Sequence, residues 1–535
     1  MTTVYRGARI FTADAPEWAE ALVVDDDTIT YVGDVARARH AAGSDPEVVD
    51  LDGGLILPGF VDAHAHVLQS GEAFLRADLM TAPDLSEIER RLCTWAESNP
   101  DAPRVLGKGW LFSSVPDGRP TRQMLDAAVP DRPAYLDAND YHSVWVNSAA
   151  LAELGITDDT PDPAGGRIVR DKSGVATGVF EETALQEIVW PFLAKADTDA
   201  ARDEQLAAVV GAYVQCGVTG AVDMALDHDA LAAMARAEDA GTLPIRIAAH
   251  WLVRRAGDTT GHLEQVAEAA RLAARHASPQ LRVTGIKLIV DGVIDGCTAA
   301  MLEPYANGTN AEPIWDIDAL APVVAAADAA GLQVALHAIG DRAVRTAIDA
   351  LEHAADVNGR RPRRHRIEHL EYVDQADVPR LAKAGITASM QPVHADPAIQ
   401  ETWRAVLGDG RVERGFAWPE MSGSGAHLAF GTDTPTAPYL PLHNLYVAAT
   451  RRSAIDPAQP ANNADLALPL ADAIRHATRD AAWSCLAEDR RGRLAPGMLA
   501  DFVAIDSDPF VSGAESLLTA RTRCTVIGGR RYDLD

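Results

Sequence analysis

Short apolar runs alternate with alanine-rich stretches through the second half of this 535-residue chain. Residues 283–290 are followed, after a loop, by the alanine-rich stretch 319–330, and residues 333–337 are followed by the stretch 343–355. Further short apolar runs occupy 366–370, 386–390 and 428–433. Apolar strands separated by helices predict a parallel sheet whose outer face the helices cover. A chain of this length favours closing that sheet into an α/β fold of the (β/α)8 TIM-like barrel type over an open sheet.

The two ends of the chain differ from this pattern, because both read as short strands joined by turns. Residues 21–24 and 28–33 flank an acidic turn, which predicts a hairpin. The C-terminal residues 492–535 have the same strand-like character. Each end is too short to bury a core alone, so we expect residues 1–57 and 492–535 to pair into one small β-sandwich domain.

Residues 58–491 remain for the barrel domain. Within them the stretch of about 67–199 fits the strand–helix repeat poorly, since it holds many Pro, Gly and Asp residues at irregular spacing. We therefore expect a large insertion after the first barrel strand, where it could overhang the site as a substrate-binding subdomain.

An apolar, strand-like segment at residues 57–66 ends in two histidines that are two residues apart, His64 and His66. Side chains on a strand alternate between faces with a period of two, so both imidazoles point the same way and can bind one metal ion. A lone pair of this kind also arises by chance on protein surfaces. Its meaning therefore depends on further ligands downstream.

Polar residues stand at the ends of the other predicted strands, where barrel enzymes place their reactive groups. Imidazoles and carboxylates suit Zn²⁺ and similar divalent ions, and a site with open positions lets a bound water lose a proton near neutral pH. The sequence therefore predicts a metal site whose candidate ligands are His64, His66, Lys287, His337, His369 and Asp433.

Lys287 needs its own explanation, because metal ions would repel an ammonium group. A desolvated lysine with a lowered pKa can react with carbon dioxide to give a carbamate, which is an anionic bridging ligand. The alternative is an unmodified Lys287 that forms an ion pair with Asp291 or Asp433.

Seven short motifs are spread over nearly the whole chain. They are PGFVDAHAH at 58–66, GKGW at 107–110, GIKLIVDG at 285–292, HAIGD at 337–341, RIEH at 366–369, GTD at 431–433 and APGMLAD at 495–501. In this combination they resemble the amidohydrolase superfamily, specifically the YtcJ-like metal-dependent hydrolases of amidohydrolase family 3, a group related to N-substituted formamide deformylase. After Gly292 the chain reads VIDGCT, where small and basic residues are commoner in the family, and this departure affects substrate contacts rather than the metal site.

The resemblance implies a binuclear centre with two divalent metal ions, zinc being the expected metal. The implied ligands are His64 and His66 on one ion, His337 and His369 on the other, and an N-carboxylated Lys287 as the bridge. Asp433 would lie beside the bridging hydroxide. There it could take a proton from the attacking hydroxide and deliver it to the leaving amine, acting as base and then as acid.

The implied reaction is hydrolysis of a carbon–nitrogen bond in a small molecule, of the non-peptide amide, N-acyl or formamide type. We find no G-x-S-x-G elbow, P-loop or convincing dinucleotide fingerprint in the sequence. One alternative is a lactone or ester hydrolase with the same metal centre. Another is a non-catalytic scaffold, which the presence of all six ligand positions disfavours.

Four residues are candidates for substrate contact: His142, Trp110, His394 and Asp291. His142 lies in the insertion and resembles a family position near the substrate, whereas packing is its alternative role. Trp110 could line the pocket, although buried tryptophans usually belong to a core. His394 follows the seventh strand, where it could contact either the substrate or a loop carbonyl.

Charge and cysteine usage limit the partners and the compartment. The chain carries 48 Lys and Arg against 77 Asp and Glu, a formal charge of -29, and so acidic a surface repels nucleic-acid phosphates and anionic lipid head groups. The N-terminal residues lack a basic region followed by a long apolar core, and the five cysteines form no Cys-x-x-Cys pair. We therefore expect a cytoplasmic protein with reduced thiols and a small-molecule substrate, and leave a homo-oligomer such as a dimer open.

Overall fold

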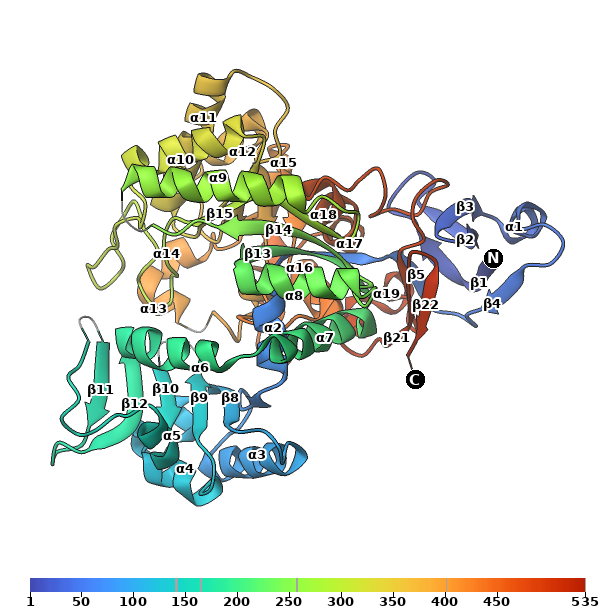
Figure 1. The fold of residues 1–535 in the computed structure, drawn as a ribbon. Coiled ribbons are helices and arrows are strands. Elements are labelled where there is room, and N and C mark those ends of the chain that lie inside the picture. Colours follow the sequence, from blue (N-terminus) through green and yellow to red (C-terminus); the bar gives the residue numbers. More distant parts are fainter. Residues whose placement is uncertain (140–142, 164–165, 256–257, 401, 535) are drawn as a thin grey trace. The chain divides into compact units, whose positions relative to one another are not determined.

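The computed structural model describes residues 1–139, 143–163, 166–255, 258–400 and 402–534 (Figure 1). The chain divides into two compact units. Unit 1 comprises Met1–Val67 and Val210–Asp535, and unit 2 comprises Leu68–Val209.

Eight parallel strands in unit 1 form a nearly closed barrel, as the strand–helix alternation predicts. In neighbour order the strands are β6 (Phe60–Ala65), β13 (Val218–Leu226), β14 (Arg246–Leu252), β15 (Leu281–Ile289), β16 (Gln333–Ala338), β17 (Arg366–His369), β18 (Thr387–Met390) and β19 (His427–Phe430). The first and last strands meet where the backbone N–H groups of Thr432 and Asp433 donate to the carbonyl oxygen of His64 at 3.2 and 2.7 Å.

A glycine permits this approach between β19 and β6. A Cβ atom at Gly431 would lie 2.2 Å from the backbone nitrogen of His64, so any larger residue would push the two strand ends apart. In the Gly-Thr-Asp motif, Gly431 is therefore needed for strand packing, whereas Asp433 is a candidate metal ligand.

Helices cover the outer face of the barrel (Figure 1). Asp227, Asp258 and Asp316 each accept a hydrogen bond from a backbone N–H of the first turn and so begin three of these helices as N-caps. The helices after β13 are α8 (His228–Asp239), α9 (Thr259–Arg275), α10 (Ile317–Ala329), α11 (Asp341–Asn358), α12 (Val378–Ala384), α13 (Trp403–Leu407), α14 (Asp409–Val412), α15 (Trp418–Gly423), α16 (Pro441–Thr450), α17 (Leu470–Ala477), α18 (Arg479–Ser484) and α19 (Pro509–Ser512).

Small apolar side chains form a core cluster among the barrel strands. Alanines predominate in it, which allows close packing where the strands converge. The cluster consists of Val61, Ala63, Val222, Met224, Ala248, Ala335, Ala429, Ala481, Ala482 and Cys485.

Strands from the two ends of the chain lie in one further sheet of unit 1. Its neighbour order is β22-β21-β20-β5-β1-β2-β3, with β4 beside β1, and β5 pairs with β20 in antiparallel register. The strands are β1 (Thr2–Phe11), β2 (Trp18–Asp25), β3 (Thr28–Gly33), β4 (Glu47–Asp50), β5 (Leu55–Pro58), β20 (Phe502–Ile505), β21 (Thr522–Ile527) and β22 (Arg530–Asp533), with α1 (Val35–Ala41) after β3. The predicted hairpin is the antiparallel pair β2–β3.

Unit 2 has a sheet and a core of its own. Its neighbour order is β11-β12-β10-β9-β8-β7, and Trp110 and Trp145 are fully buried in its core. The strands are β7 (Ala77–Asp78), β8 (Val105–Trp110), β9 (Ala134–Ala138), β10 (Ser143–Val146), β11 (Gly166–Arg170) and β12 (Ala176–Glu182). The helices between β6 and β13 are α2 (Val67–Phe74), α3 (Leu85–Ser98), α4 (Arg122–Ala128), α5 (Ser148–Glu153), α6 (Trp190–Ala196) and α7 (Asp199–Gln215).

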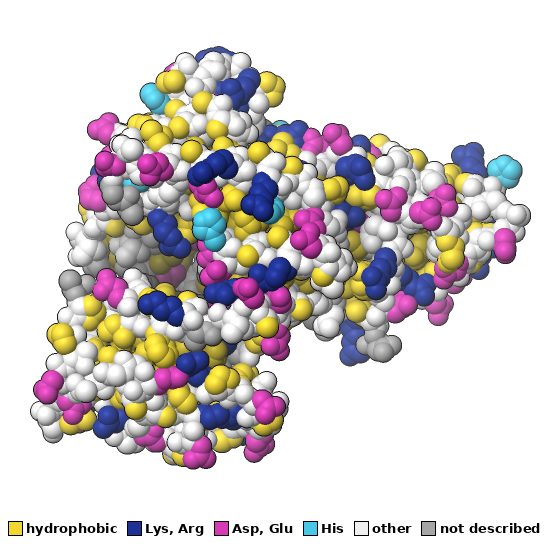
Figure 2. Space-filling view, in the orientation of Figure 1, with side chains coloured by type: hydrophobic (Ala, Val, Ile, Leu, Met, Phe, Trp, Pro, Cys, Tyr) yellow, Lys and Arg dark blue, Asp and Glu magenta, His cyan; other side chains and the backbone are white. Residues whose placement is uncertain are grey.

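Acidic and basic side chains are interspersed on the visible face of the molecule, without one large patch of either sign (Figure 2). Among the described residues, no helix combines the length and the apolar character needed to cross a membrane.

Candidate metal centre

A buried ion pair on β17, formed by Arg366 and Glu368, contacts the imidazole of His64. Its Nδ1 lies 2.7 Å from Glu368 Oε2, and two guanidinium nitrogens of Arg366 donate to the same carboxylate. Burial opposes ionisation of Glu368, but Arg366 and His64 outweigh it and hold the pKa of this carboxyl well below its ordinary value. The ring of His64 therefore directs Nε2 away from Glu368.

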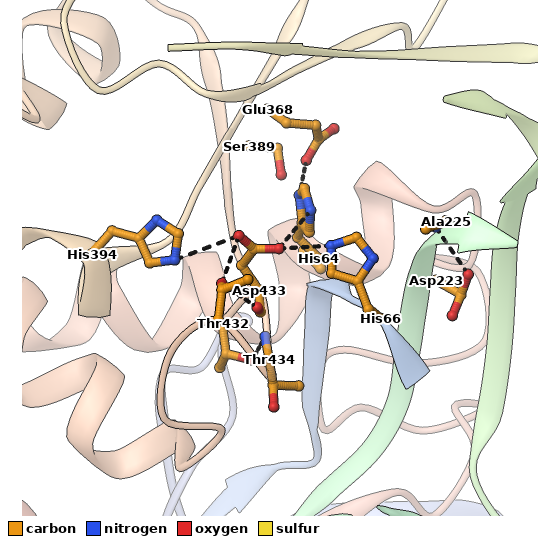
Figure 3. A network of polar contacts seen from close by, with 12 residues as sticks. His64, His66, Asp223, Ala225, Glu368, Ser389, His394, Thr432, Asp433 and Thr434 are labelled. Carbon is orange, nitrogen blue, oxygen red and sulfur yellow. Dashed lines mark hydrogen bonds and ion pairs between the residues drawn. The ribbon is translucent and has the colours of Figure 1, made fainter. Parts of the chain in front are cut away.

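Asp433 is the point on which the histidines converge (Figure 3). Its Oδ1 lies 3.1 Å from His64 Nε2 and 2.9 Å from His66 Nε2, while the Thr436 hydroxyl donates to Oδ2 at 3.0 Å. Burial raises the pKa of Asp433, but the two imidazoles reverse that effect and hold it well below its ordinary value. The carboxylate is thus an anion at neutral pH.

His337 and His369 stand on the neighbouring strands β16 and β17. The His369 ring lies 4.3 Å from the His337 ring and 4.9 Å from the His64 ring, measured between centroids. Burial lowers the pKa of His337 to about 3 and that of His369 well below its ordinary value. Both imidazoles are therefore neutral, which is the state that binds metal ions.

Lys287 lies on β15, two residues before Ile289, which is opposite His337 in the strand register. The lysine is 2% exposed, and burial lowers the pKa of its amine to about 8. Within the described part of the chain it forms no ion pair with Asp291 or Asp433, which was the alternative to a carbamate. With this pKa about a tenth of the amine is neutral at pH 7, far more than for an ordinary lysine, and the neutral amine is the form that reacts with carbon dioxide.

Two of the candidate ligands have strained backbones. His369 has φ of 75° and Asp433 has φ of 60°, the left-handed region that non-glycine residues rarely adopt. Such conformations cost about 1–3 kcal/mol each and concentrate at functional sites, where the surrounding fold holds them in place. His369 is the last residue of β17, and Asp433 lies three residues after the end of β19.

The donor set fits a divalent metal ion. His64 Nε2, His369 Nδ1 and Asp433 Oδ1 are buried, and none of these three atoms has a hydrogen-bond partner among the described residues. These three residues offer ligand atoms that lie within 4.8 Å of one another. Buried polar atoms normally have a partner, so three orphaned atoms at one place indicate a site for an ion. Four ligand atoms around Zn²⁺ at about 2.0–2.2 Å stand roughly 3.3 Å apart, close to the separations between Asp433 Oδ1 and the two imidazole nitrogens.

A second cluster adjoins the first through His394 and Glu371. His394 Nδ1 lies 3.2 Å from Glu371 Oε1, and its Nε2 lies 3.5 Å from Asp433 Oδ2. Burial disfavours a charged His394, but Glu371 and Asp433 outweigh it and raise the pKa of this imidazole, while burial raises the pKa of Glu371. His369, Glu371 and His394 also form a group whose ligand atoms lie within 4.8 Å of one another.

Sequence reasoning overlooked Glu368 and Glu371. Arg366 and Glu368 are two residues apart on one strand and therefore share a face, which is the sequence signal for an ion pair between them. Glu371 follows the strand in a loop, where nothing in the sequence indicates that it meets His394.

The predicted substrate contacts have different surroundings. Asp291 is fully buried, and its carboxylate accepts backbone hydrogen bonds from Ala300, Ile339 and Gly340 at 2.9–3.0 Å, so it holds the segments after β15 and β16 together. Trp110 packs in the core of unit 2, where its indole N–H donates to the Leu136 carbonyl at 2.9 Å. His142 lies outside the described residues.

Comparisons with known proteins identify the family of this chain. The family model described as "Amidohydrolase family" matches residues 47–532. The Bacillus subtilis (strain 168) protein YtcJ is 31% identical over 545 residues, with 99% of each chain covered. N-substituted formamide deformylase from Arthrobacter pascens is 27% identical over 550 residues, covering 98% of this chain and 97% of that protein.

A solved structure resembles this chain over nearly its whole length. The crystal structure of an uncharacterized metal-dependent hydrolase from Pyrococcus horikoshii OT3 has a TM-score of 0.79 and 25% identity, covering 96% of this chain and 99% of that chain. The chain therefore belongs to the amidohydrolase family and is a metal-dependent hydrolase of carbon–nitrogen bonds other than peptide bonds.

Proposed function

We propose that this protein hydrolyses the carbon–nitrogen bond of a small non-peptide amide, of the N-acyl or formamide type. The observation that carries the proposal is the convergence of His64, His66 and His369 on the buried carboxylate of Asp433, where His64 Nε2, His369 Nδ1 and Asp433 Oδ1 have no hydrogen-bond partner among the described residues. The formamide class is supported by the similarity to N-substituted formamide deformylase over nearly the whole chain.

Two divalent ions, zinc in the first instance, are the proposed cofactors. The proposed ligands are His64 and His66 for one ion, His337 and His369 for the other, and an N-carboxylated Lys287 between them. The lowered pKa of Lys287, about 8, supports carboxylation because carbon dioxide reacts only with the neutral amine. When bound, such ions polarise a substrate carbonyl and lower the pKa of a water molecule.

Asp433 is the proposed acid/base. Its carboxylate is ionised and fixed by the Thr436 hydroxyl, so it can accept a proton from the attacking water and then donate that proton to the leaving nitrogen. His394 stands beside it with Nε2 toward Asp433 and Nδ1 toward Glu371. We assign His394 the role of a hydrogen-bond donor to the substrate, oriented by Glu371.

The domain division follows the same proposal. Residues 58–491 would form the hydrolase barrel with an insertion at about 67–199, and residues 1–57 and 492–535 would form the β-sandwich. A cytoplasmic location is proposed with it, on the basis of the cysteine usage and the acidic composition.

The experiment that tests the function is a substrate screen. The protein is purified with zinc and bicarbonate, its metal content is measured, and N-substituted formamides, N-acyl compounds, carbamates, lactones and esters are assayed side by side. We expect two metal equivalents and turnover of amides. Turnover of lactones or esters alone would refute the amide assignment, and failure to bind any divalent ion after reconstitution would refute the metal centre.

The carbamate bridge has its own test. Lys287→Ala should lose at least half of the bound metal and most of its activity, and short carboxylic acids should restore part of both by taking the place of the carbamate. Full activity of Lys287→Ala without added acid would contradict the bridge.

A further inference from the structure

The carboxylate of Glu368 lies in the barrel interior, and nothing in the proposed reaction uses it. The residue is fully buried, as is Arg366, which shares its strand and its face. A buried ion pair is costly to form unless its geometry and remaining hydrogen bonds are well satisfied. Here they are satisfied on both sides, because Arg366 donates to both oxygens of Glu368 and His64 Nδ1 lies 2.7 Å from Oε2.

Arg366 also links this pair to the strand that carries His64. Its Nη2 donates to the carbonyl oxygen of Ala63 at 2.6 Å, as well as to the Ser389 hydroxyl on β18. The guanidinium therefore connects three barrel strands, β6, β17 and β18. It fixes the backbone directly before His64 while Glu368 fixes the imidazole of His64.

A carboxylate that has only acceptor sites determines the tautomer of the histidine beside it. Glu368 Oε2 accepts, so Nδ1 carries a proton, and in the neutral ring that binds a metal ion Nε2 then carries the lone pair. In this structure Nε2 lies 3.1 Å from Asp433 Oδ1, and no described residue forms a hydrogen bond with it. Nε2 is thus the nitrogen presented to the cluster formed with Asp433 and His369.

We infer that Arg366 and Glu368 form a positioning pair that holds His64 in the Nδ1–H tautomer and directs its Nε2 lone pair to the metal position. This inference rests on the proposed function only where it concerns metal affinity, because the tautomer is a property of the chain itself. Carboxylates that orient a ligating histidine typically change metal affinity by about 10–100-fold.

The chain offers a matched control. Asp328 accepts from Arg363 Nε at 2.7 Å and lies 2.9 Å from His365 Nε2, so it repeats the arginine–carboxylate–histidine arrangement. Here the other histidine nitrogen accepts a hydrogen bond from the backbone N–H of Val334 at 3.0 Å. Asp328→Asn therefore disturbs an equivalent buried pair without touching a proposed ligand.

The first measurement is direct. Nitrogen-15 NMR of histidine-labelled, metal-free wild-type protein reports which ring nitrogen is protonated, and the His64 signals are identified by their loss in His64→Gln. We expect the Nδ1–H tautomer. A His64 ring without a proton on Nδ1 would overturn the inference, whether or not any variant folds, whereas protonation of Nδ1, with or without a second proton on Nε2, supports it.

The second measurement is zinc affinity by competition with a chelator. Glu368→Gln replaces the anionic acceptor by a neutral amide and should weaken zinc binding about 10–100-fold, whereas Asp328→Asn should leave it within about 2-fold. Equal zinc affinity of Glu368→Gln and wild type would refute the positioning role. Absence of zinc binding in the wild type would instead refute the proposed function, and the tautomer measurement would still decide the inference.

Discussion

Among the described residues of unit 1, two arginine–carboxylate–histidine groups have a buried carboxylate and a buried histidine, and they differ in what the second histidine nitrogen does. The His64 group consists of Arg366, Glu368 and His64, and the His365 group consists of Arg363, Asp328 and His365. The other nitrogen of His365 accepts a hydrogen bond from the Val334 N–H, whereas His64 Nε2 lies close to Asp433 and has no hydrogen-bond partner in the described part of the chain. The same combination of side-chain types can therefore stabilise the fold or orient a metal ligand. The second histidine nitrogen distinguishes the His365 group from the His64 group.

The electrostatics of the two groups support this distinction. In both, burial disfavours the carboxylate anion, but the surrounding donors outweigh it and hold the pKa of Glu368 and of Asp328 below the ordinary value. Ionisation is thus common to both groups. What separates them is the neighbourhood, because the rings of His66 and His369 and the carboxylate of Asp433 lie beside His64, whereas the second nitrogen of His365 meets a backbone N–H.

The largest expected effect comes from the carboxylate that faces His64 Nε2. Asp433→Asn should lower kcat about 10²–10⁴-fold on the amide found in the substrate screen, because an amide cannot accept and return a proton. Asparagine tolerates the left-handed backbone at this position, so the fold should persist. Steady-state kinetics of Asp433→Asn and of Asp328→Asn check this, since the second variant should retain kcat within about 3-fold. More than a tenth of wild-type kcat in Asp433→Asn would assign the proton transfer to another group.

The next largest effect is expected in the free energy of unfolding, for a variant of the His365 group. Asp328→Asn removes a buried anion and leaves the mostly buried guanidinium of Arg363 without its counter-ion, which should lower the free energy of unfolding by about 3–5 kcal/mol. Urea unfolding measures this loss. Asp349→Asn is the exposed control, since the Asp349 side chain is 47% exposed in its ion pair with Arg380 and should cost less than about 1 kcal/mol. Equal losses in the two variants would show that the His365 group contributes no more than a surface ion pair.

The sequence predicted the barrel and most of its proposed ligands for one physical reason. Polar residues at the ends of otherwise apolar runs are conspicuous, and a barrel gathers all strand ends on one face. Strands β13 and β14 were not located in the sequence, because runs such as Arg246–Leu252 contain alanines and no continuous β-branched segment. Alanine has no strong preference for strands, so only the tertiary contacts identify these two.

The roles of buried charges could not be predicted in the same way. His365 and His369 stand four residues apart around one strand, and only the fold shows that the first meets Asp328 on α10 while the second meets His64. Glu368 and Asp328 likewise depend on contacts between segments far apart in the chain. A sequence pattern indicates that a group is present, whereas its partner is determined by packing.

A third buried histidine extends the comparison, because its partner is an amide instead of a carboxylate. His250 Nε2 lies 3.0 Å from Gln333 Oε1, and burial lowers the pKa of His250 to about 3. The unfolded chain binds a proton at this residue near pH 6.5, so the folded state loses stability relative to the unfolded state as the pH falls from about 6.5 toward 3. The slope attributable to one such group approaches about 1.4 kcal/mol per pH unit.

The check is a comparison with His250→Asn in metal-free protein. This variant removes the titrating group, so the difference in free energy of unfolding between wild type and variant should change by about 1.4 kcal/mol per pH unit between pH 6 and pH 4 and level off above pH 7. Urea unfolding at a series of pH values gives both curves. Parallel curves would mean that His250 is protonated in the folded protein as readily as in the unfolded chain.

The smallest expected effect concerns the outermost contact of the His64 group. Arg366 Nη2 carries two hydrogens but has three acceptors, namely the Ala63 carbonyl, Glu368 and the Ser389 hydroxyl. Ser389→Ala therefore leaves no hydrogen without an acceptor, and it should lower the free energy of unfolding by only about 0.5–1 kcal/mol and change zinc affinity less than about 3-fold. Urea unfolding and chelator competition measure the two quantities. A loss of zinc affinity as large as that of Glu368→Gln would mean that the Ser389 hydroxyl, rather than Glu368, sets the position of Arg366 and through it the orientation of His64.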